Sequence, residues 1–338
     1  MMFSKFNRPV AATLLSLTLA ACGGGGGGDT TTTSTDSTLG TTIPTGTTTT
    51  STLSSTVDPG VLYVREPDVA SCDAGELNPA ERDKVLARLN VIRALHGLPA
   101  VAYEPNDDVY VTAAALIIAA NEQLSHTPAT TANCWTNDGY TGSQKSNLHI
   151  FMSSSSTTRE SSEASVDGFL IDDNVSSLGH RRWLLDPFLF STAFGRVDGL
   201  WPDSTWGNVT GTALKVINDV QANISHMSPT YIAYPVGNYP ASLFDTDWYL
   251  SFSVLADVNN KANNANVDFS GATISVSSGD QALGVNSQSW NNQGYGLPNV
   301  LQWKVSGLQT GVDYAVTISN VKLPDGSTKN YSYDFRLE

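Results

Sequence analysis

The stretch that decides the fold is Leu178–Pro187, with the sequence LGHRRWLLDP. It places one histidine and two adjacent arginines in a part of the chain that is otherwise dominated by apolar and hydroxyl residues. Asp186 and Pro187 close it, because a residue before proline is pushed out of helical geometry. A second histidine, His126, ends a long apolar segment upstream. The question that the sequence raises is whether His126 and His180 meet in the folded chain.

The composition limits the class of protein. The chain has 338 residues, of which 40% are hydrophobic and 15% are charged, and its net charge is −14. The length predicts about two domains. The acidic balance argues against nucleic acid as a partner, because phosphate binding needs a basic face. These values favour a protein of the cell envelope or the extracellular space.

The N-terminus has the pattern of an export signal. Lys5 and Arg8 precede an apolar run, Val10–Ala20, which is shorter than the roughly 20 residues that a membrane-spanning helix needs. Small residues and Cys22 end the run. The pattern resembles a bacterial lipoprotein signal, which implies a signal peptide over residues 1–21, lipidation of Cys22 and anchoring to a bacterial membrane. An ordinary secretory peptide with an incidental cysteine is the alternative.

A linker and a cysteine pair follow the signal. Residues 22–58 are rich in Gly, Thr and Ser, so we predict a flexible linker with too few apolar side chains to become ordered. The remaining cysteines, Cys72 and Cys134, form an even pair in an oxidising compartment, which predicts a disulfide. Two free buried thiols are the alternative.

Residues 59–222 alternate helical and strand-like segments and predict an α/β layered domain. A first helix begins after Asn78, a capping residue, and stops at Gly97. A second helix, apolar on nearly all sides, runs from about residue 107 to 124, and a third spans about 160–172.

The segment between the second and third predicted helices, residues 128–158, has the composition of a long polar loop. Residues 146–150 within it alternate like a short strand. We expect His149, at this strand-like segment, to be a partly exposed residue of the loop.

Residues 223–338 change character. Their apolar residues recur with a period of two in short segments broken by Gly, Asn, Asp and Pro. This pattern predicts an all-β, sandwich-like domain with an accessory or adhesive role.

Four motifs in a fixed order resemble one known family. They are RLNVIRALHGLP at Arg88–Pro99, LSHT at Leu124–Thr127, SNL at Ser146–Leu148 and GHRRWLL at Gly179–Leu185. Together they resemble the CAP superfamily of cysteine-rich secretory, antigen five and pathogenesis-related proteins, also called SCP-like extracellular domains. The resemblance covers roughly residues 77–220.

The resemblance implies a CAP-type α-β-α sandwich, whose cleft carries two histidines and two acidic residues. His126 and His180 stand at the histidine places, and Asp172 stands at one acidic place, three residues after Phe169. The other acidic place holds Ser146. One of the four cleft groups is therefore not ionisable here, which puts a shared mechanism of the four in doubt.

Three functions follow as hypotheses. The first is a binding module whose cleft holds a ligand such as a peptide, sterol or lipid. His126 and His180, with Asp172 nearby, could also hold a divalent metal such as Zn, and Glu160 and Glu163 are reserve carboxylates. The second is a hydrolase of peptides or esters with a histidine as general base, although no Gly-x-Ser-x-Gly motif introduces a nucleophile. The third is a structural or adhesive surface protein.

Several of these residues also have purely structural interpretations. His126 and His180 could be buried histidines that bond to the backbone. We expect Arg181 and Arg182 to be surface residues in ion pairs. We expect His96, in the last turn of the first helix, to carry a partly positive ring that suits the helix dipole.

Overall fold

The structure, a computed structural model, describes residues 61–227 and 230–338. The predicted signal peptide, the predicted lipidation site Cys22 and the predicted linker lie outside the described residues. The helices are α1 (Pro79–Leu95), α2 (Asp108–Asn121), α3 (Asn137–Lys145), α4 (Ser162–Ile171) and α5 (Gly179–Leu184), with short 3-10 helices at Val69–Ser71, Pro105–Asp107, Ala241–Leu243 and Lys261–Asn266. The strands are β1 (Tyr63–Arg65), β2 (Glu76–Leu77), β3 (Ala102–Tyr103), β4 (Ser146–Ser153), β5 (Ser191–Thr192), β6 (Phe194–Gly199), β7 (Asn208–Lys215), β8 (Tyr231–Tyr234), β9 (Gly237–Tyr239), β10 (Leu250–Val254), β11 (Thr273–Ser278), β12 (Gln281–Ala282), β13 (Val285–Asn291), β14 (Val300–Val305), β15 (Asp313–Lys322) and β16 (Thr328–Leu337).

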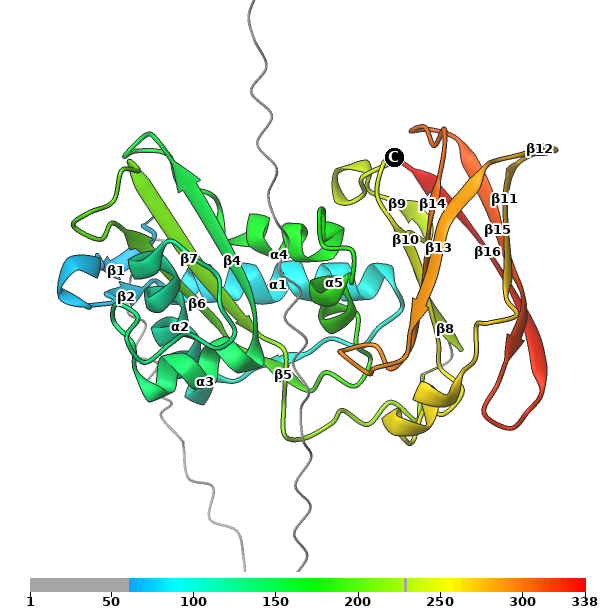
Figure 1. The fold of residues 1–338 in the computed structure, drawn as a ribbon, viewed down its shortest axis with the longest axis horizontal. Helices are drawn as coiled ribbons and strands as arrows, with labels where there is room; N and C mark the ends of the chain where they lie inside the picture. The colour runs from blue at the N-terminus through cyan, green and yellow to red at the C-terminus, as the bar shows by residue number, and fades with distance from the viewer. Residues whose placement is uncertain (1–60, 228–229) are drawn as a thin grey trace, which may run out of the picture. The chain divides into compact units, whose positions relative to one another are not determined.

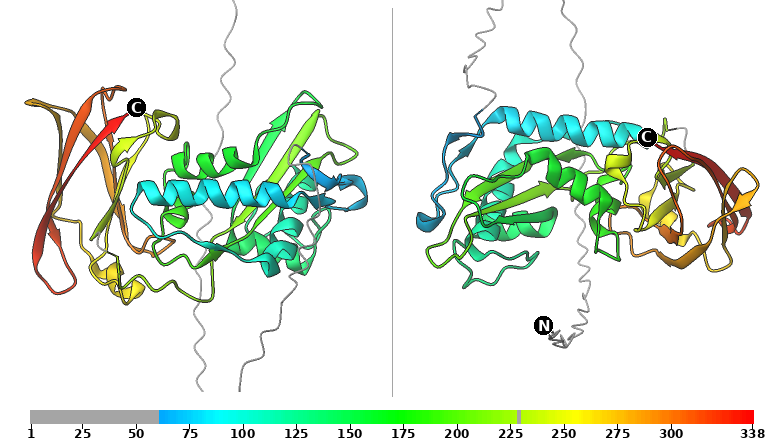
Figure 2. Two further views of the ribbon diagram at one scale, coloured as in Figure 1. Left: turned by 180° about the vertical axis from the view of Figure 1, so that it is seen from behind. Right: turned by 90° about the horizontal axis from the view of Figure 1, so that it is seen from above.

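The N-terminal half has three layers (Figures 1 and 2). Its central sheet is antiparallel, with strand order β4-β7-β6. One face packs on α2, where Leu148 and Ala213 join the core of that helix. The other face packs on α1 and α4, where Phe194 and Leu214 join Leu89 in the main core. The predicted α/β fold with helices on both faces of a sheet is confirmed.

Small residues explain how closely α2 approaches the sheet. A Cβ on Gly195 would lie 2.3 Å from the backbone of Val111, and one on Gly211 would lie 2.4 Å from the carbonyl oxygen of Ala115. A side chain at either glycine would therefore push the helix away. The alanine-rich sequence of α2 serves the same close packing.

The first helix is confirmed, with the side chain of Asn78 accepting a hydrogen bond from the amide of Ala80 at 3.0 Å. The strand-like pattern at residues 146–150 is confirmed, but the interpretation of the rest of residues 128–158 as a long polar loop is wrong. This segment contains α3, capped by the side chain of Thr136, and the eight-residue β4.

The C-terminal half is β-rich, as predicted, and consists of two sheets with strand orders β13-β14-β10-β8 and β12-β11-β15-β16-β9. Pairs within them are antiparallel except for β9, which runs parallel to β16. Phe252 of the first sheet stacks on Tyr333 of the second, with ring centroids 6.3 Å apart. The two sheets thus share one apolar core, as in a sandwich.

The predicted disulfide is confirmed. The sulfur atoms of Cys72 and Cys134 are bonded, and their Cα atoms lie 5.3 Å apart. The bridge ties the segment before α1 to the segment before α3. The expected domain boundary at 222/223 falls between β7 and β8 and stays a prediction. Among the residues that the structure describes, none of the helices has the length and apolar character needed to cross a membrane.

Candidate functional site

His180 and Asp172 form a hydrogen-bonded pair between α5 and the end of α4. His180 Nδ1 lies 2.8 Å from Asp172 Oδ1, and the other carboxylate oxygen accepts the backbone N–H of Arg181 at 3.2 Å. The Asp172 side chain is 0% exposed and that of His180 is 25% exposed. An ionised carboxylate accepts hydrogen bonds, so it holds the proton on Nδ1 and leaves Nε2 available to a ligand.

Asp172 reaches this position through an uncommon backbone conformation. It ends α4 with φ of 54°, in the left-handed region, and its amide donates to the carbonyl of Gly168 at 2.8 Å. Aspartate tolerates this region better than most residues because its short side chain can bond locally. The chain therefore turns at the end of α4 and directs this carboxylate at the start of α5.

A second histidine–carboxylate pair lies beside the first. His149 Nε2 is 2.6 Å from Glu160 Oε2, and both side chains are partly exposed. The ring of Phe169 contacts both imidazoles, with centroid distances of 6.2 Å to His149 and 5.1 Å to His180. We call these five residues the two-dyad site. In it, two imidazoles that are each bonded to a carboxylate contact the same buried phenyl ring.

The expectation that His149 is a loop residue is wrong. It lies within β4, and its register partner is Thr212 of β7, which in turn pairs with Arg196 of β6. The alternation at residues 146–150 was the signal that could have placed it on a sheet face. Its partner Glu160 precedes α4 instead of lying on it, because that helix begins at Ser162.

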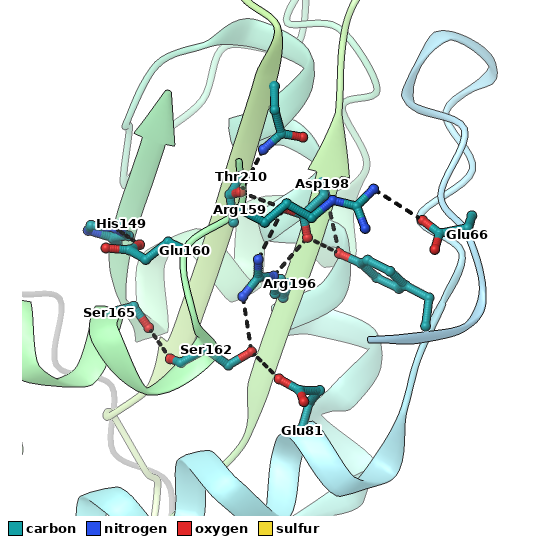
Figure 3. Close-up of polar contacts among 12 residues, drawn as sticks. Glu66, Glu81, His149, Arg159, Glu160, Ser162, Ser165, Arg196, Asp198 and Thr210 are labelled. Carbon is teal, nitrogen blue, oxygen red and sulfur yellow. Dashed lines mark hydrogen bonds and ion pairs between the residues drawn. The ribbon is translucent and has the colours of Figure 1, made fainter. Parts of the chain in front are cut away.

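Arg196, which lies in the same register row as His149, belongs to a buried polar network on the sheet (Figure 3). Arg196 Nε donates to Asp198 Oδ2 at 2.7 Å and Nη2 donates to Oδ1 at 3.1 Å, while Nη1 donates to Ser162 Oγ at 3.1 Å. Tyr63 and Thr210 also donate to the Asp198 carboxylate. Burial alone would raise the pKa of Asp198, but the hydrogen bonds and the charge of Arg196 outweigh it and lower that pKa. The network fixes the sheet beneath the two-dyad site.

His126 has a different environment. Its Nδ1 lies 2.8 Å from the backbone carbonyl oxygen of Ser143, in α3. The contacts described above thus place His126 against α3 and His180 against α4. Their convergence in one cleft stays a prediction. Ser146, at the remaining place of the expected cleft, is buried at the start of β4.

The residues present do not fit a Zn site. Within residues 61–227 and 230–338, no group of three or more His, Cys, Asp or Glu side chains could hold a metal ion. Asp172 and Glu160 are hydrogen-bonded to imidazoles in the structure. A metal on His126 and His180 would therefore need ligands that this arrangement does not provide.

The expectation that Arg181 and Arg182 form surface ion pairs is wrong, because both are buried. Arg181 donates to the carbonyls of Leu170 at 2.7 Å and Tyr249 at 2.8 Å. Arg182 donates to the carbonyl of Leu297 at 3.2 Å, and burial lowers its pKa to about 10. Backbone carbonyls of α4 and of the β-rich half thus replace the expected carboxylates.

The expectation of a partly positive His96 is also wrong. Its ring is buried, with Nδ1 2.8 Å from the carbonyl oxygen of Ala233 and Nε2 3.1 Å from the Tyr239 hydroxyl. Burial lowers the pKa of His96 to about 4, so the ring is neutral at pH 7. The side chain joins α1 to strands β8 and β9.

Comparison with known proteins adds little to this geometry. No family model matches the chain, and no curated protein matches it. One solved structure with a match is an extracellular protein containing an SCP domain from Bacillus anthracis strain Ames. It is 18% identical over 41% of this chain and 42% of that chain, with a TM-score of 0.26. The match spans less than half of either protein and carries no argument about function.

Proposed function

We propose that this chain is a CAP-type module, anchored to a bacterial cell envelope through a lipidated Cys22, that binds a ligand at the two-dyad site. The four sequence motifs, which follow one another in the order typical of the family, and the lipoprotein-like N-terminus support this proposal. The Cys72–Cys134 bridge supports an oxidising compartment outside the cytoplasm. Charge supports a ligand other than nucleic acid, because the chain carries a net −14.

One observation carries the proposed binding role. The part-exposed ring of His180 is held by a fully buried carboxylate. A second oriented imidazole, His149, contacts the same phenyl ring. Because each carboxylate fixes one ring nitrogen, the other can donate to or accept from a polar group of a ligand. Peptides and lipid headgroups both offer such groups.

Nuclear magnetic resonance of the histidine rings tests the binding role. The full chain would be titrated with a mixture of short peptides and, separately, with vesicles of phosphatidylglycerol and phosphatidylcholine. We expect one of them to shift the ring resonances of His149 and His180, whereas those of the buried His96 stay unchanged. If neither probe shifts these resonances, no ligand binds at this site. If the His149 resonances still shift unchanged in the His180→Ala variant or in the Asp172→Asn variant, the ligand does not bind at this site.

Membrane fractionation tests the anchor. We expect the full chain to sediment with membranes in bacterial cells and to become soluble after Cys22→Ser. Sedimentation of the Cys22→Ser variant would show that lipidation is not what holds the protein there.

A hydrolase is the second candidate, because a buried aspartate behind a histidine is the arrangement of a general base. Against it, no hydroxyl or thiol of the described residues is hydrogen-bonded to the rings of His149 or His180. Such an enzyme would have to activate water directly. Turnover of peptide or ester substrates that is lost in both His180→Ala and Asp172→Asn would establish it over simple binding.

A further inference from the structure

Strand β4 forms an open edge of the central sheet, next to the two-dyad site. The strand order β4-β7-β6 gives β4 a single neighbour, β7, and the two strands pair residue by residue from Ser146 to Ser153. Figure 3 shows His149, which lies on this strand, with Glu160 next to it. An edge strand presents main-chain donors and acceptors to which another extended chain can bind.

The hydrogen bonds to β7 determine which main-chain groups point to the open edge. The Val216 amide donates to the Lys145 carbonyl at 2.9 Å, and Ser146 is the register partner of Lys215. In an antiparallel pair, this pattern makes Ser146 a non-hydrogen-bonded position, and the positions then alternate. The odd-numbered residues of β4 therefore bond to β7, and the main-chain groups of the even-numbered residues point toward the open edge.

Two of these even-numbered residues are accessible. Leu148 is 3% exposed, but Ile150 is only partly buried and Met152 is 38% exposed. In the part of the chain that the structure describes, no other segment bonds to the main chain of Ile150 or Met152. The strand also lacks the features that commonly protect an edge, because it contains no proline and no lysine and its register does not shift. The end of β4 that carries His149 can therefore pair with a further strand.

A strand added at this edge would place one of its side chains at the two-dyad site. Because His149 bonds to β7, it would face a non-hydrogen-bonded position of an added antiparallel strand, where paired side chains lie closest together. A basic residue at that position would lie beside the Glu160 carboxylate. The residues opposite Ile150 and Met152 would lie on the other face of the sheet, next to apolar side chains.

Charge favours a peptide from another protein over a second copy of this chain. Each copy carries a net charge of −14, so two copies repel each other, whereas a basic peptide is attracted. The accessible part of the edge, residues 149–153, is also short. It suits one peptide segment better than the interface of a stable protein complex, which buries roughly 1,200–2,000 Å².

We propose that β4 binds an extended peptide segment of another protein as an added strand, through main-chain hydrogen bonds to Ile150 and Met152. A basic residue of the peptide lies opposite His149, and apolar residues lie opposite Ile150 and Met152. This inference rests on the proposed function, because it assigns a peptide, and not a lipid headgroup, to the two-dyad site.

Two peptides that differ only in the positions of their N-methyl groups test the strand geometry. The parent probe is acetyl-Val-Thr-Val-Arg-Val-amide, and its binding to the full chain is followed through the ring resonances of His149. N-methylation removes a donor and blocks pairing along one edge of an extended peptide. Methylation at the valines, which bond to Ile150 and Met152, should weaken binding about tenfold or more, whereas methylation at the threonine and the arginine should leave it unchanged.

A matched pair of variants locates the edge. Met152→Pro removes the N–H that points away from β7, and proline is tolerated at such positions of edge strands. Met152→Val keeps both this N–H and an apolar side chain. We expect Met152→Pro to bind the parent peptide about tenfold more weakly, and Met152→Val to bind it as the wild type does. The methylated peptides are measured on the wild type, so they decide the question even if the proline variant does not fold.

The outcomes separate this inference from the proposed function. If vesicles shift the rings of His149 and His180 but the peptide does not, or if both methylated peptides bind equally well, strand addition is overturned and a ligand at the two-dyad site still stands. If neither probe shifts the rings, both proposals fail. A dimer of the full chain that Met152→Pro dissociates, measured by sedimentation equilibrium, would show that β4 pairs with a second copy and would also overturn the inference.

Discussion

Asp198 offers the sharpest test of how the sheet beneath the two-dyad site is stabilised. Its side chain is 0% exposed and accepts from Arg196, Tyr63 and Thr210. Asp198→Asn removes the charge and leaves the Arg196 guanidinium buried without a counter-ion. Breaking one side of a buried pair costs about 3–5 kcal/mol. At an unfolding entropy of about 2.1 cal/mol/K per residue, that cost corresponds to a fall in melting temperature of roughly 4–9 °C for a chain of this size.

The assay is urea denaturation at pH 7 followed by circular dichroism, with Asp313→Asn as the matched control. Asp313 also pairs with an arginine, Arg336, at 3.1 Å, but its side chain is 82% exposed. An exposed pair contributes about 0–1 kcal/mol, so the control should stay near the wild type. Equal and small losses in the two variants would refute the argument that burial makes the Asp198 pair important.

The pH dependence gives a second readout of the same pair. The folded-state pKa of Asp198 is lowered, so the unfolded chain takes up the proton first as pH falls. The stabilisation is therefore complete above the usual carboxyl pKa of about 3.9 and is lost as pH falls through the folded-state value. Asp198→Asn should flatten the stability profile in that acid window, and an unchanged profile would contradict the assignment.

Three further predictions concern stability. Replacing Cys72 and Cys134 together by alanine should cost about 4 kcal/mol in denaturation experiments, because the bridge closes a loop with a sequence separation of 62 residues; a cost below 1 kcal/mol would show that the unfolded chain is not restrained by it. The folded-state pKa of His96 is lowered to about 4, so the stabilisation by its neutral ring is complete above about pH 6.5 and is lost as pH falls from there to 4. The His96→Gln variant should therefore show a smaller change of stability over this pH range. A pH profile identical to that of the wild type would argue against a buried neutral ring. Gly296→Ala should lower the free energy of unfolding by about 2 kcal/mol more than Gly294→Ala does. Both glycines have positive φ, but only a Cβ at residue 296 would meet backbone, 2.3 Å from a carbonyl oxygen of α5. Similar melting temperatures for the two variants would exclude that steric contact.

Local signals in the sequence predicted much of the fold. The cap at Asn78, the pattern of α2 and the period-two segments of the C-terminal half all mark elements that the structure contains. The cysteine pair was predictable because the expected oxidising compartment and the even count both favoured a bridge. Such features depend on neighbouring residues or on composition, which one sequence records directly.

The partners of the polar residues were harder to predict. Arg181 and Arg182 bind backbone carbonyls, and a carbonyl acceptor has no signature in the sequence because every residue carries one. Glu160 meets His149 only because the segment before α4 turns back on β4. The family resemblance pointed to Asp172 and His180. The second pair and its position next to Phe169 could not be predicted, because they depend on contacts between segments far apart in the sequence.

The role of the stretch LGHRRWLLDP follows from three successive side chains on one short helix. Successive helical residues point about 100° apart, so His180, Arg181 and Arg182 face different surroundings. His180 bonds to the end of α4, while Arg181 reaches Tyr249 and Arg182 reaches Leu297 in the β-rich half. The helix α5 thus carries both the His180 ring and two buried guanidinium groups that bond to carbonyls just before β10 and β14. Residues 223–338 are therefore part of the structural support of the site, because the segments before β10 and β14 supply carbonyl acceptors that hold the helix carrying His180.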